Sequence, residues 1–352
     1  SVRGSAMCRA SDEVHATSRR RRQLLAAFLG VLTAFLMSAM ALTAKKAVEH
    51  GGTPMLVVMV RGLVGWLFAC IILIVRRAPR DDFIGPPHTW RLLAMRVVVG
   101  TAALALFLLG LPLLPLGDLT ALFLTNQIWT ALMARLFFGE ALKRSHAIGL
   151  AIALPGALLI VQPSALFAPP SGVVPVSSPA YAPLLPIGAA VGAAGAYVSV
   201  QACAKAGAPR SAIVHCFSVG SALLGGVALL FTGEWRALST SGPAMHGLLV
   251  LCGVFAFAAQ TALTAAIQLD GATIFSITQL SEVAFAFVWD AAFFGVHATK
   301  RTLLGALLTA VGVLAASLLP PRLPVPRLCC GTRRTRWRVL DEPKAGTEVG
   351  RA

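Results

Sequence analysis

Charged side chains are scarce in this 352-residue sequence, where they make up 12% of the residues against 57% for hydrophobic ones. Soluble domains carry about a quarter charged residues. With a mean hydropathy of +0.78, the chain has more apolar surface than one soluble core can bury. The shortage of charge therefore excludes an ordinary soluble protein and indicates a protein whose solvent is lipid.

Acidic residues are scarcer still, with 14 Asp and Glu against 30 Lys and Arg, which gives a net charge of +16. Such a charge can indicate nucleic-acid binding. Here, however, the Arg and Lys residues lie between and beside apolar runs and do not form a soluble basic face. We therefore expect no nucleic-acid partner.

The patterns needed for metal or disulfide chemistry are also missing. The seven cysteines contain no CxxC pair, and the seven histidines show no i, i+4 pairing. Membrane hydrolases need convergent His, Asp and Glu side chains on facing helices. The sequence therefore predicts no enzyme, no cofactor and no metal site. The single asparagine, Asn126, is followed by Gln127 and Ile128, so no N-glycosylation sequon exists.

Long apolar runs dominate what is present. A helix needs roughly 20 apolar residues to cross the hydrocarbon core, and the runs lack the alternation of a transmembrane barrel. We expect an all-α membrane protein with ten transmembrane helices. They are predicted at 24–44, 54–75, 92–112, 116–138, 146–162, 183–204, 211–231, 246–268, 272–295 and 302–319.

A short motif occurs twice at a fixed spacing. Phe137-Phe138-Gly139, with Gly149 after it, recurs 156 residues later as Phe293-Phe294-Gly295, with Gly305 after it. Each copy closes an apolar run, so the chain reads as two repeats of five spans. An odd number of spans per repeat makes the second repeat cross the membrane upside down relative to the first, as in inverted-repeat transporters.

The placement of Lys and Arg predicts the orientation. Basic residues are far more frequent on the side that receives both termini than on the other side, which favours cytoplasmic termini. The first run is too long for a signal-peptide core, so we expect it to be retained as a helix. The predicted organisation is a basic cytoplasmic tail, repeat 1, a Pro- and Ser-rich linker, repeat 2 and a basic disordered cytoplasmic tail, at 1–23, 24–162, 163–182, 183–319 and 320–352.

The last tail carries Cys329 and Cys330 just beyond the final span, where S-palmitoylation often occurs. An unmodified thiol pair is the alternative. No retention or transit signal stands out, so the expected location is the plasma membrane or an endomembrane. If the chain self-associates, the expected assembly is a homodimer.

Several motifs carry a family resemblance. Leu116-Gly117-Asp118, Phe137-Phe138-Gly139-Glu140, Gly149, Pro155-Gly156 and Gln162-Pro163 resemble an EamA domain of the drug/metabolite transporter superfamily. Arg61 also resembles an arginine that this family carries in its second span. The region 183–319 resembles a second EamA domain, although Val296 stands where the first has Glu140. The chain is most similar in character to the solute carrier family thirty-five G-like proteins, and the resemblance implies a ten-span inverted-repeat transporter.

Polar side chains inside the spans are the candidate site. An ionisable side chain in hydrocarbon persists only with a partner or a function, and Glu282 lies near the predicted midplane. The 156-residue offset maps Glu282 onto Asn126. We predict that Asn126, Gln127, Gln260 and Glu282 line a central aqueous cavity and that Glu282 is a candidate for proton coupling. The structural alternative is that the amides only join helices by hydrogen bonds.

Arg61 is predicted about 10 Å inside the second span, where it needs an anion. Asp290 is the expected ion-pair partner, and an anionic substrate group is the alternative. Arg96 and Arg135 lie nearer the cytoplasmic ends of their spans and are expected to snorkel to the interface.

These residues predict a secondary permease or exchanger that moves a small organic metabolite by alternating access. Because the set contains one arginine and no second mid-membrane cation, small neutral or zwitterionic metabolites are favoured over phosphorylated ones. A lipid scramblase or a non-transporting membrane scaffold is the alternative, which packed and dry surroundings for Asn126 and Glu282 would favour.

Overall fold

The protein is described from a computed structural model. It describes residues 2–110, 113–114, 116–139, 143–163, 166, 179, 181–236, 242–294 and 299–318. Within these ranges the chain is helical and contains no strand. The helices are α1 (Val2–Glu49), α2 (Pro54–Val75), α3 (Arg80–Ile84), η1 (Pro87–Thr89), α4 (Trp90–Gly110), α5 (Leu116–Phe123), α6 (Asn126–Phe138), α7 (Arg144–Val161), α8 (Leu184–Lys205), α9 (Arg210–Thr232), α11 (Pro243–Asp270), α12 (Ala272–Thr278), α13 (Ser281–Phe294) and α14 (Lys300–Leu318).

Nine segments in the described part of the chain are long and apolar enough to cross a membrane. The predicted run at 116–138 is not among them, and the chain divides there into α5, of 8 residues, and α6, of 13 residues. The run at 272–295 is also divided, into α12 and α13, but the two halves together still count as one span. The prediction of an all-helical membrane protein is confirmed, whereas ten spans stay a prediction.

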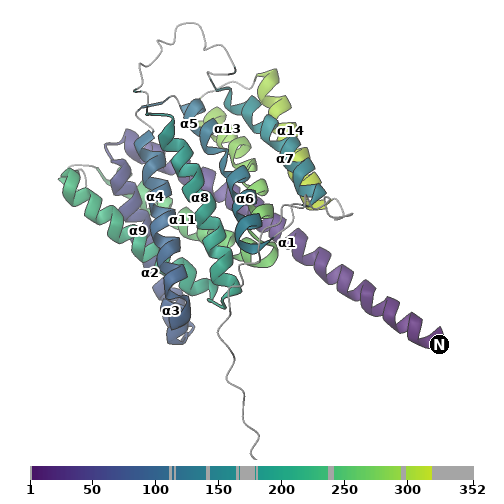
Figure 1. The fold of residues 1–352 in the computed structure, drawn as a ribbon. Coiled ribbons are helices and arrows are strands. Elements are labelled where there is room, and N and C mark those ends of the chain that lie inside the picture. Colours follow the sequence, from purple (N-terminus) through teal and green to yellow (C-terminus); the bar gives the residue numbers. More distant parts are fainter. Residues whose placement is uncertain are drawn as a thin grey trace, which may run out of the picture.

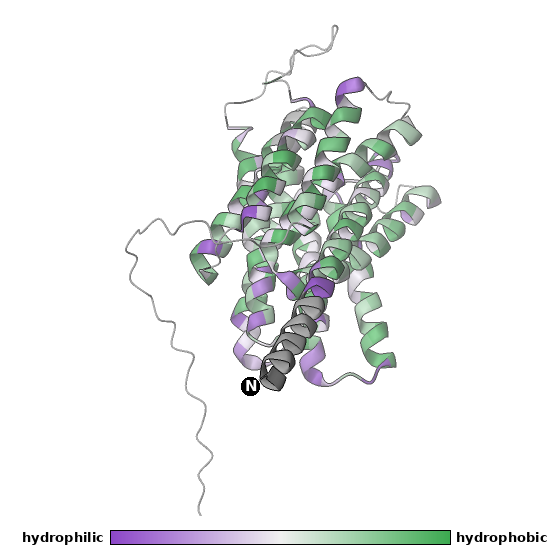
Figure 2. Cartoon of the chain, turned by 90° about the vertical axis from the view of Figure 1, so that its right-hand side faces the viewer, coloured by the Kyte–Doolittle hydropathy of each residue, from purple (hydrophilic) through white to green (hydrophobic). Residues whose placement is uncertain are grey.

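The outer faces of the helices are apolar and exposed. Phe231 is 87% exposed, Val75 77% and Leu136 71%. Figure 2 shows hydrophobic residues along most of the ribbon, with hydrophilic ones mainly toward the helix ends. Water would not tolerate so large an exposed apolar surface, so these faces require lipid around the protein. The chain is an integral, multi-pass membrane protein.

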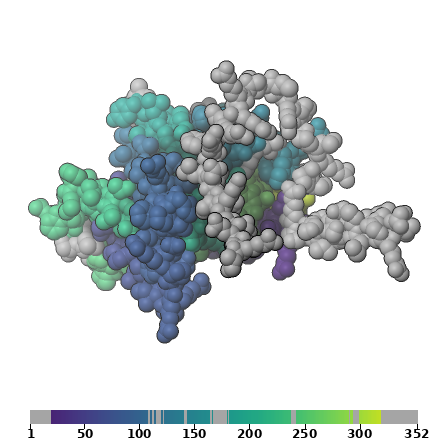
Figure 3. Space-filling view, turned by 60° about the horizontal axis from the view of Figure 1, so that its bottom comes forward, coloured from purple at the N-terminus to yellow at the C-terminus, as the bar shows by residue number. Residues whose placement is uncertain are grey.

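Four helix pairs account for most of the packing. Helix α1 packs on α11, α4 on α8, α2 on α9, and α7 on α14. Each pair joins a helix from the first half of the chain to one from the second half, so the halves interleave (Figure 1). The N-terminal end of α1 projects from the bundle (Figure 1). The segment around α3 also protrudes from the bundle, at its lower end in Figure 1 (Figures 1 and 3).

Glycines allow two of these pairs to pack backbone against backbone. A Cβ built at Gly156 on α7 would lie 2.6 Å from the backbone nitrogen of Thr309 on α14, and one at Gly305 would lie 2.6 Å from the carbonyl oxygen of Gly156. At the α2–α9 crossing, a Cβ at Gly62 would lie 2.5 Å from the nitrogen of Ala222. Such close approach holds membrane helices together by van der Waals contact. Gly149 and Gly305 of the repeated motif both serve the α7–α14 contact.

A buried glutamine fixes the start of α12. The side-chain oxygen of Gln201, on α8, accepts a hydrogen bond of 2.9 Å from the backbone N–H of Ala272. The first N–H groups of a helix have no partner within the helix. Gln201 therefore supplies an acceptor where water is absent, and it ties α12 to α8.

We expect Gln201→Leu to lower the free energy of unfolding by about 1–3 kcal/mol, because it leaves a buried N–H without an acceptor. Thermal unfolding in detergent, followed by tryptophan fluorescence, measures the effect. Gln268→Leu is the matched control, since the side chain of Gln268 accepts its hydrogen bond from Arg210 at an exposed position where water can replace it. Equal melting temperatures for the two variants would contradict the role assigned to Gln201.

Candidate functional site

Three predicted site residues lie at the two helix interruptions. Asn126 and Gln127 are the first two residues of α6, and Glu282 is the second residue of α13. Before each of these helices the backbone makes a tight turn, with i to i+3 hydrogen bonds from Thr125 to Leu122 and from Leu280 to Ile277. The two turns are at corresponding places in the two halves. Interrupted helices leave backbone polar groups unpaired inside the membrane, which is how many transporters build binding sites.

The side chains at these turns are only partly hydrogen-bonded. Asn126 and Gln127 are buried, and their side-chain oxygens have no hydrogen-bond partner. Glu282 is half-buried, and its carboxylate lies 3.5 Å from the side-chain nitrogen of Gln279. Buried polar atoms without partners are rare in proteins. The turns therefore retain hydrogen-bonding capacity that the fold itself does not use.

A cavity in the bundle interior contains the two remaining residues of the predicted set that the structure describes. It offers about 10 Å³ of space, enough for roughly one water. Its residues come from α2, α9 and α11: Arg61, Gly62, Gly65, Phe217, Ser218, Ser221, Ala256, Phe257 and Gln260. Arg61 and Gln260 thus share one site. Asn126, Gln127 and Glu282 do not line it, so the structure divides the predicted cavity set into two groups.

The expectation that Arg96 snorkels to the interface is wrong. Arg96 on α4 is only 3% exposed, and its Nη2 donates a hydrogen bond of 3.1 Å to the side-chain oxygen of Gln260. Its guanidinium carbon lies 3.9 Å from the ring centre of Phe217, and that of Arg61 lies 5.9 Å from the same centre. Cation–π attraction to one ring brings the two arginines together. Arg135, in contrast, is exposed.

Two residues that the sequence analysis did not single out, Tyr197 and Ser221, lie near the candidate site residues. The ring of Tyr197, on α8, packs edge to face on that of Phe275, on α12, with the ring centres 5.1 Å apart, and α12 is the short helix that precedes Gln279 and Glu282. The hydroxyl oxygen of Ser221 is buried without a partner at the cavity wall. Tyr197 is one of only two tyrosines in the chain, and its place in the middle of an apolar run was the available signal.

Two predictions fall on parts that the structure leaves open. The backbone of Asp290 belongs to α13, but its side chain is outside the described residues, so its pairing with Arg61 stays a prediction. Cys329 and Cys330 also lie outside the described residues. Their lipidation likewise stays a prediction.

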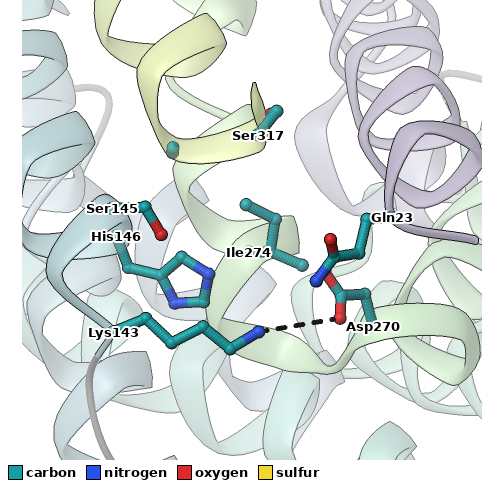
Figure 4. Close-up of a pocket in the computed structure, with 8 residues that line it drawn as sticks. Gln23, Lys143, Ser145, His146, Asp270, Ile274 and Ser317 are labelled. Carbon is teal, nitrogen blue, oxygen red and sulfur yellow. Dashed lines mark ion pairs between the residues drawn. The ribbon is translucent and has the colours of Figure 1, made fainter. Parts of the chain in front are cut away.

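A second cavity lies where α7, α11, α14 and α1 meet. Lys143, just before α7, lies 4.0 Å from the carboxylate of Asp270 at the end of α11, and the pair joins the two halves of the chain. Figure 4 shows Lys143 and Asp270 reaching toward one another, with His146 beside the lysine and Gln23 beside the aspartate. The space is again about 10 Å³. This ion pair therefore joins the two halves at this end of the bundle.

The structure defines a class of protein, the multi-pass membrane proteins with a polar centre. Its outer faces are apolar, its interior holds buried polar and cationic side chains, and two of its helices are interrupted. Comparison with known families gives the assignment. The EamA-like transporter family matches residues 24–162 and 181–318. The chain belongs to this family of membrane transporters.

Individual relatives agree with that assignment. The mouse protein "Solute carrier family 35 member G1" is 27% identical over 318 residues, which cover 90% of this chain and 84% of that protein. Its human counterpart is 26% identical and covers 89% of this chain. The "Pseudopaline exporter CntI" of Pseudomonas aeruginosa is 26% identical over 64% of this chain and 74% of its own length.

The fold also matches a solved structure. A crystal structure covers 83% of this chain and 96% of its own, with a TM-score of 0.67 at 14% identity. At that identity the match shows a shared fold alone. The family resemblance suggested by the sequence motifs is thus confirmed from the family and relative comparisons.

Proposed function

We propose that this chain is a secondary transporter that moves a small organic metabolite by alternating access between two inverted repeats. The repeats are 24–162 and 183–319, each with five spans, and both chain termini lie in the cytoplasm. The interrupted helices α5–α6 and α12–α13 provide the fourth span of the first repeat and the fourth of the second.

The helix packing carries this proposal. If each span of the first repeat is exchanged for its counterpart in the second, the α1–α11 pair becomes the α8–α4 pair, which is also present. The same exchange maps the α2–α9 and α7–α14 pairs onto themselves. A contact pattern that survives this exchange is expected when two repeats are related by a two-fold axis. Such a pair of repeats can rock between two equivalent arrangements that expose opposite sides of the membrane.

The small interior space supports the need for such a motion. A cavity of about 10 Å³ beside Arg61 and Gln260 is too small for a metabolite, and the Lys143–Asp270 pair joins the two halves at the predicted cytoplasmic end. A solute could reach the polar centre only if the halves separate. The ion pair joins the halves at a partly exposed position, where such pairs are weak, so opening there would cost little.

We expect Glu282→Gln to reduce metabolite exchange at least about tenfold, because a carboxylate inside the membrane persists for a function. Counterflow uptake in proteoliposomes measures exchange across a panel of amino acids, sugars, nucleosides, carboxylic acids and phosphorylated metabolites, at two pH values. If Glu282 also carries the coupling proton, the residual exchange of the variant loses its dependence on pH.

Glu49→Gln is the matched control, since Glu49 pairs with Lys46 at an exposed position. It should exchange like the wild type. Undiminished exchange by folded Glu282→Gln protein would remove Glu282 from the site. If folded wild-type protein exchanges no member of the panel, the transporter proposal fails, and lipid scrambling, measured on the same vesicles with a fluorescent phospholipid, becomes the function to test.

A further inference from the structure

Two buried arginines approach the same ring, that of Phe217, in the bundle interior, and neither has an ion-pair partner in the described structure. Arg61 is 7% exposed and Arg96 3% exposed. The polar contact of Arg61 is from its Nη1 to the sulfur of Met40 at 3.6 Å. Arg96 donates to Gln260, and its Nε is buried with no acceptor. Neither guanidinium lies within ion-pair distance of a carboxylate whose side chain the structure describes.

Two guanidinium groups in this setting require a negative charge. Arginine stays protonated in proteins, so it cannot escape the cost of burial by losing its proton. Both guanidinium carbons lie within 5.9 Å of the ring centre of Phe217, so the two cations also repel one another. A buried charge is tolerated when it is paired and hydrogen-bonded. The ring of Phe217 offsets part of this cost for both arginines but leaves their N–H groups without an anionic acceptor.

The neighbouring side chains complete a site for an anion. Gln260 holds Arg96 in place, and the Ser221 hydroxyl, buried at the same cavity wall, has no partner. Arginine binds carboxylate and phosphate groups through two parallel hydrogen bonds, so two arginines and a hydroxyl can surround the oxygens of one such group. The present space of about 10 Å³ would have to widen, as the motion of the repeats provides.

We propose that Arg61 and Arg96 together bind the carboxylate or phosphate group of a small anionic solute. The proposal rests on the proposed transport function in that the solute is the transported substrate. It replaces the preference for neutral or zwitterionic metabolites, because that preference assumed a single interior arginine and the structure places a second one beside it.

The alternative partner is Asp290, which the sequence suggested for Arg61. Its helix, α13, packs mainly on α1, α7 and α14, whereas α2, which carries Arg61, packs mainly on α9 and α11. An anion from outside the protein is therefore favoured. Asp290→Asn enters the experiment to decide between the two.

The test is ligand-dependent thermal stability of the full chain in detergent, followed through its six tryptophans. The probes are succinate and inorganic phosphate, with the uncharged succinamide and chloride of equal ionic strength as controls. We expect one or both anions to raise the melting temperature, and the controls to leave it unchanged. Arg61→Gln and Arg96→Gln should weaken the apparent affinity at least about tenfold, whereas Arg135→Gln and Asp290→Asn should not.

Since Arg96 also holds Gln260 and Phe217, a variant there could fail to fold, and Arg61→Gln and Arg61→Lys then decide alone. Lysine keeps the charge but loses the paired hydrogen bonds, so it should bind with intermediate affinity. No response of folded wild-type protein to either anion would overturn the proposal. So would a response that survives in folded Arg61→Gln protein or that disappears in Asp290→Asn.

Three further outcomes show which proposal fails, the site for a solute anion or the transport function on which it rests. Stabilisation by added phosphatidylglycerol and not by the soluble anions, lost in Arg61→Gln, would assign the site to a lipid headgroup and overturn the solute proposal. In proteoliposomes, exchange of neutral metabolites without any anion response would overturn the inference and leave transport standing. Anion binding without exchange of any metabolite would uphold the site and contradict the transport function.

Discussion

Replacing Gly156 with leucine is expected to prevent the chain from folding into a stable, monodisperse protein. At the α7–α14 crossing, even a Cβ at this position would lie 2.6 Å from the nitrogen of Thr309 and 2.7 Å from the carbonyl oxygen of Gly305. These are backbone atoms of a packed helix, so they cannot rotate out of the way. Extra atoms in a well-packed core cost about 1–3 kcal/mol, and leucine adds several where the helices touch.

The measurement is size-exclusion chromatography of the solubilised protein, followed by thermal unfolding of whatever elutes as a single species. Gly156→Ala should fold but lose about 1–3 kcal/mol of stability. Gly247 on α11 provides the matched control, because a Cβ there would meet nothing within 4 Å. Gly247→Ala should gain up to about 1 kcal/mol from helix propensity. A stable Gly156→Leu protein would show that α7 and α14 can separate without loss of the fold.

The positions of most helices could be predicted from the sequence because hydrophobic length alone determines where a chain crosses a membrane. Helix α2 has the predicted bounds of 54–75, and α8 and α9 differ by one residue at each end. The repeated Phe-Phe-Gly motif also located the α7–α14 contact, since its two following glycines, Gly149 and Gly305, both lie there. A motif that recurs at a fixed spacing can therefore indicate a contact between two helices before their packing is known.

The interruptions at 124–125 and 279–280 could not be predicted. Neither contains Gly or Pro, the residues that most often break a helix. Polar residues flank both interruptions, but polar residues also occur inside unbroken membrane helices, so they do not by themselves mark a break. In the structure Asn126, Gln127 and Glu282 lie at the start of the helix that follows each interruption. Their surroundings there come from other parts of the chain, which local sequence does not reveal. Only the 156-residue match of Asn126 with Glu282 pointed to them.

The burial of Arg96 was missed for a related reason. Its depth along α4 could be counted, but the direction in which it points could not, because lipid and protein interior are both apolar and a membrane helix shows little amphipathic pattern. In the structure Arg96 points to Phe217 and Gln260, on α9 and α11. The prediction that Arg96 reaches water rested only on its short distance from the end of the span. The same limit kept Arg61 and Gln260 from being recognised as neighbours.

Arg61→Met is expected to remove at least about 90% of substrate exchange while leaving the ligand-free protein as stable as the wild type or more stable. Methionine fills a similar volume without charge. Replacing buried charged groups with apolar ones of similar size is often neutral or stabilising by about 1–4 kcal/mol. Loss of a hydrogen bond to a charged group costs about 1.5–3 kcal/mol of binding, which corresponds to roughly 10- to 150-fold.

Exchange in proteoliposomes and melting temperature in detergent, measured on the same preparation, test both halves of this expectation. Arg135→Met is the control, since Arg135 is a span arginine that is exposed. It should retain both exchange and stability. A structural role and a substrate-binding role for Arg61 predict opposite changes in the melting temperature. If Arg61 pairs with Asp290 to hold the fold, Arg61→Met leaves a buried carboxylate without a partner and lowers the melting temperature by several degrees. Loss of exchange with unchanged or raised stability instead means that the fold carries the charge of Arg61 at a cost, and that the compensating anion arrives with the substrate.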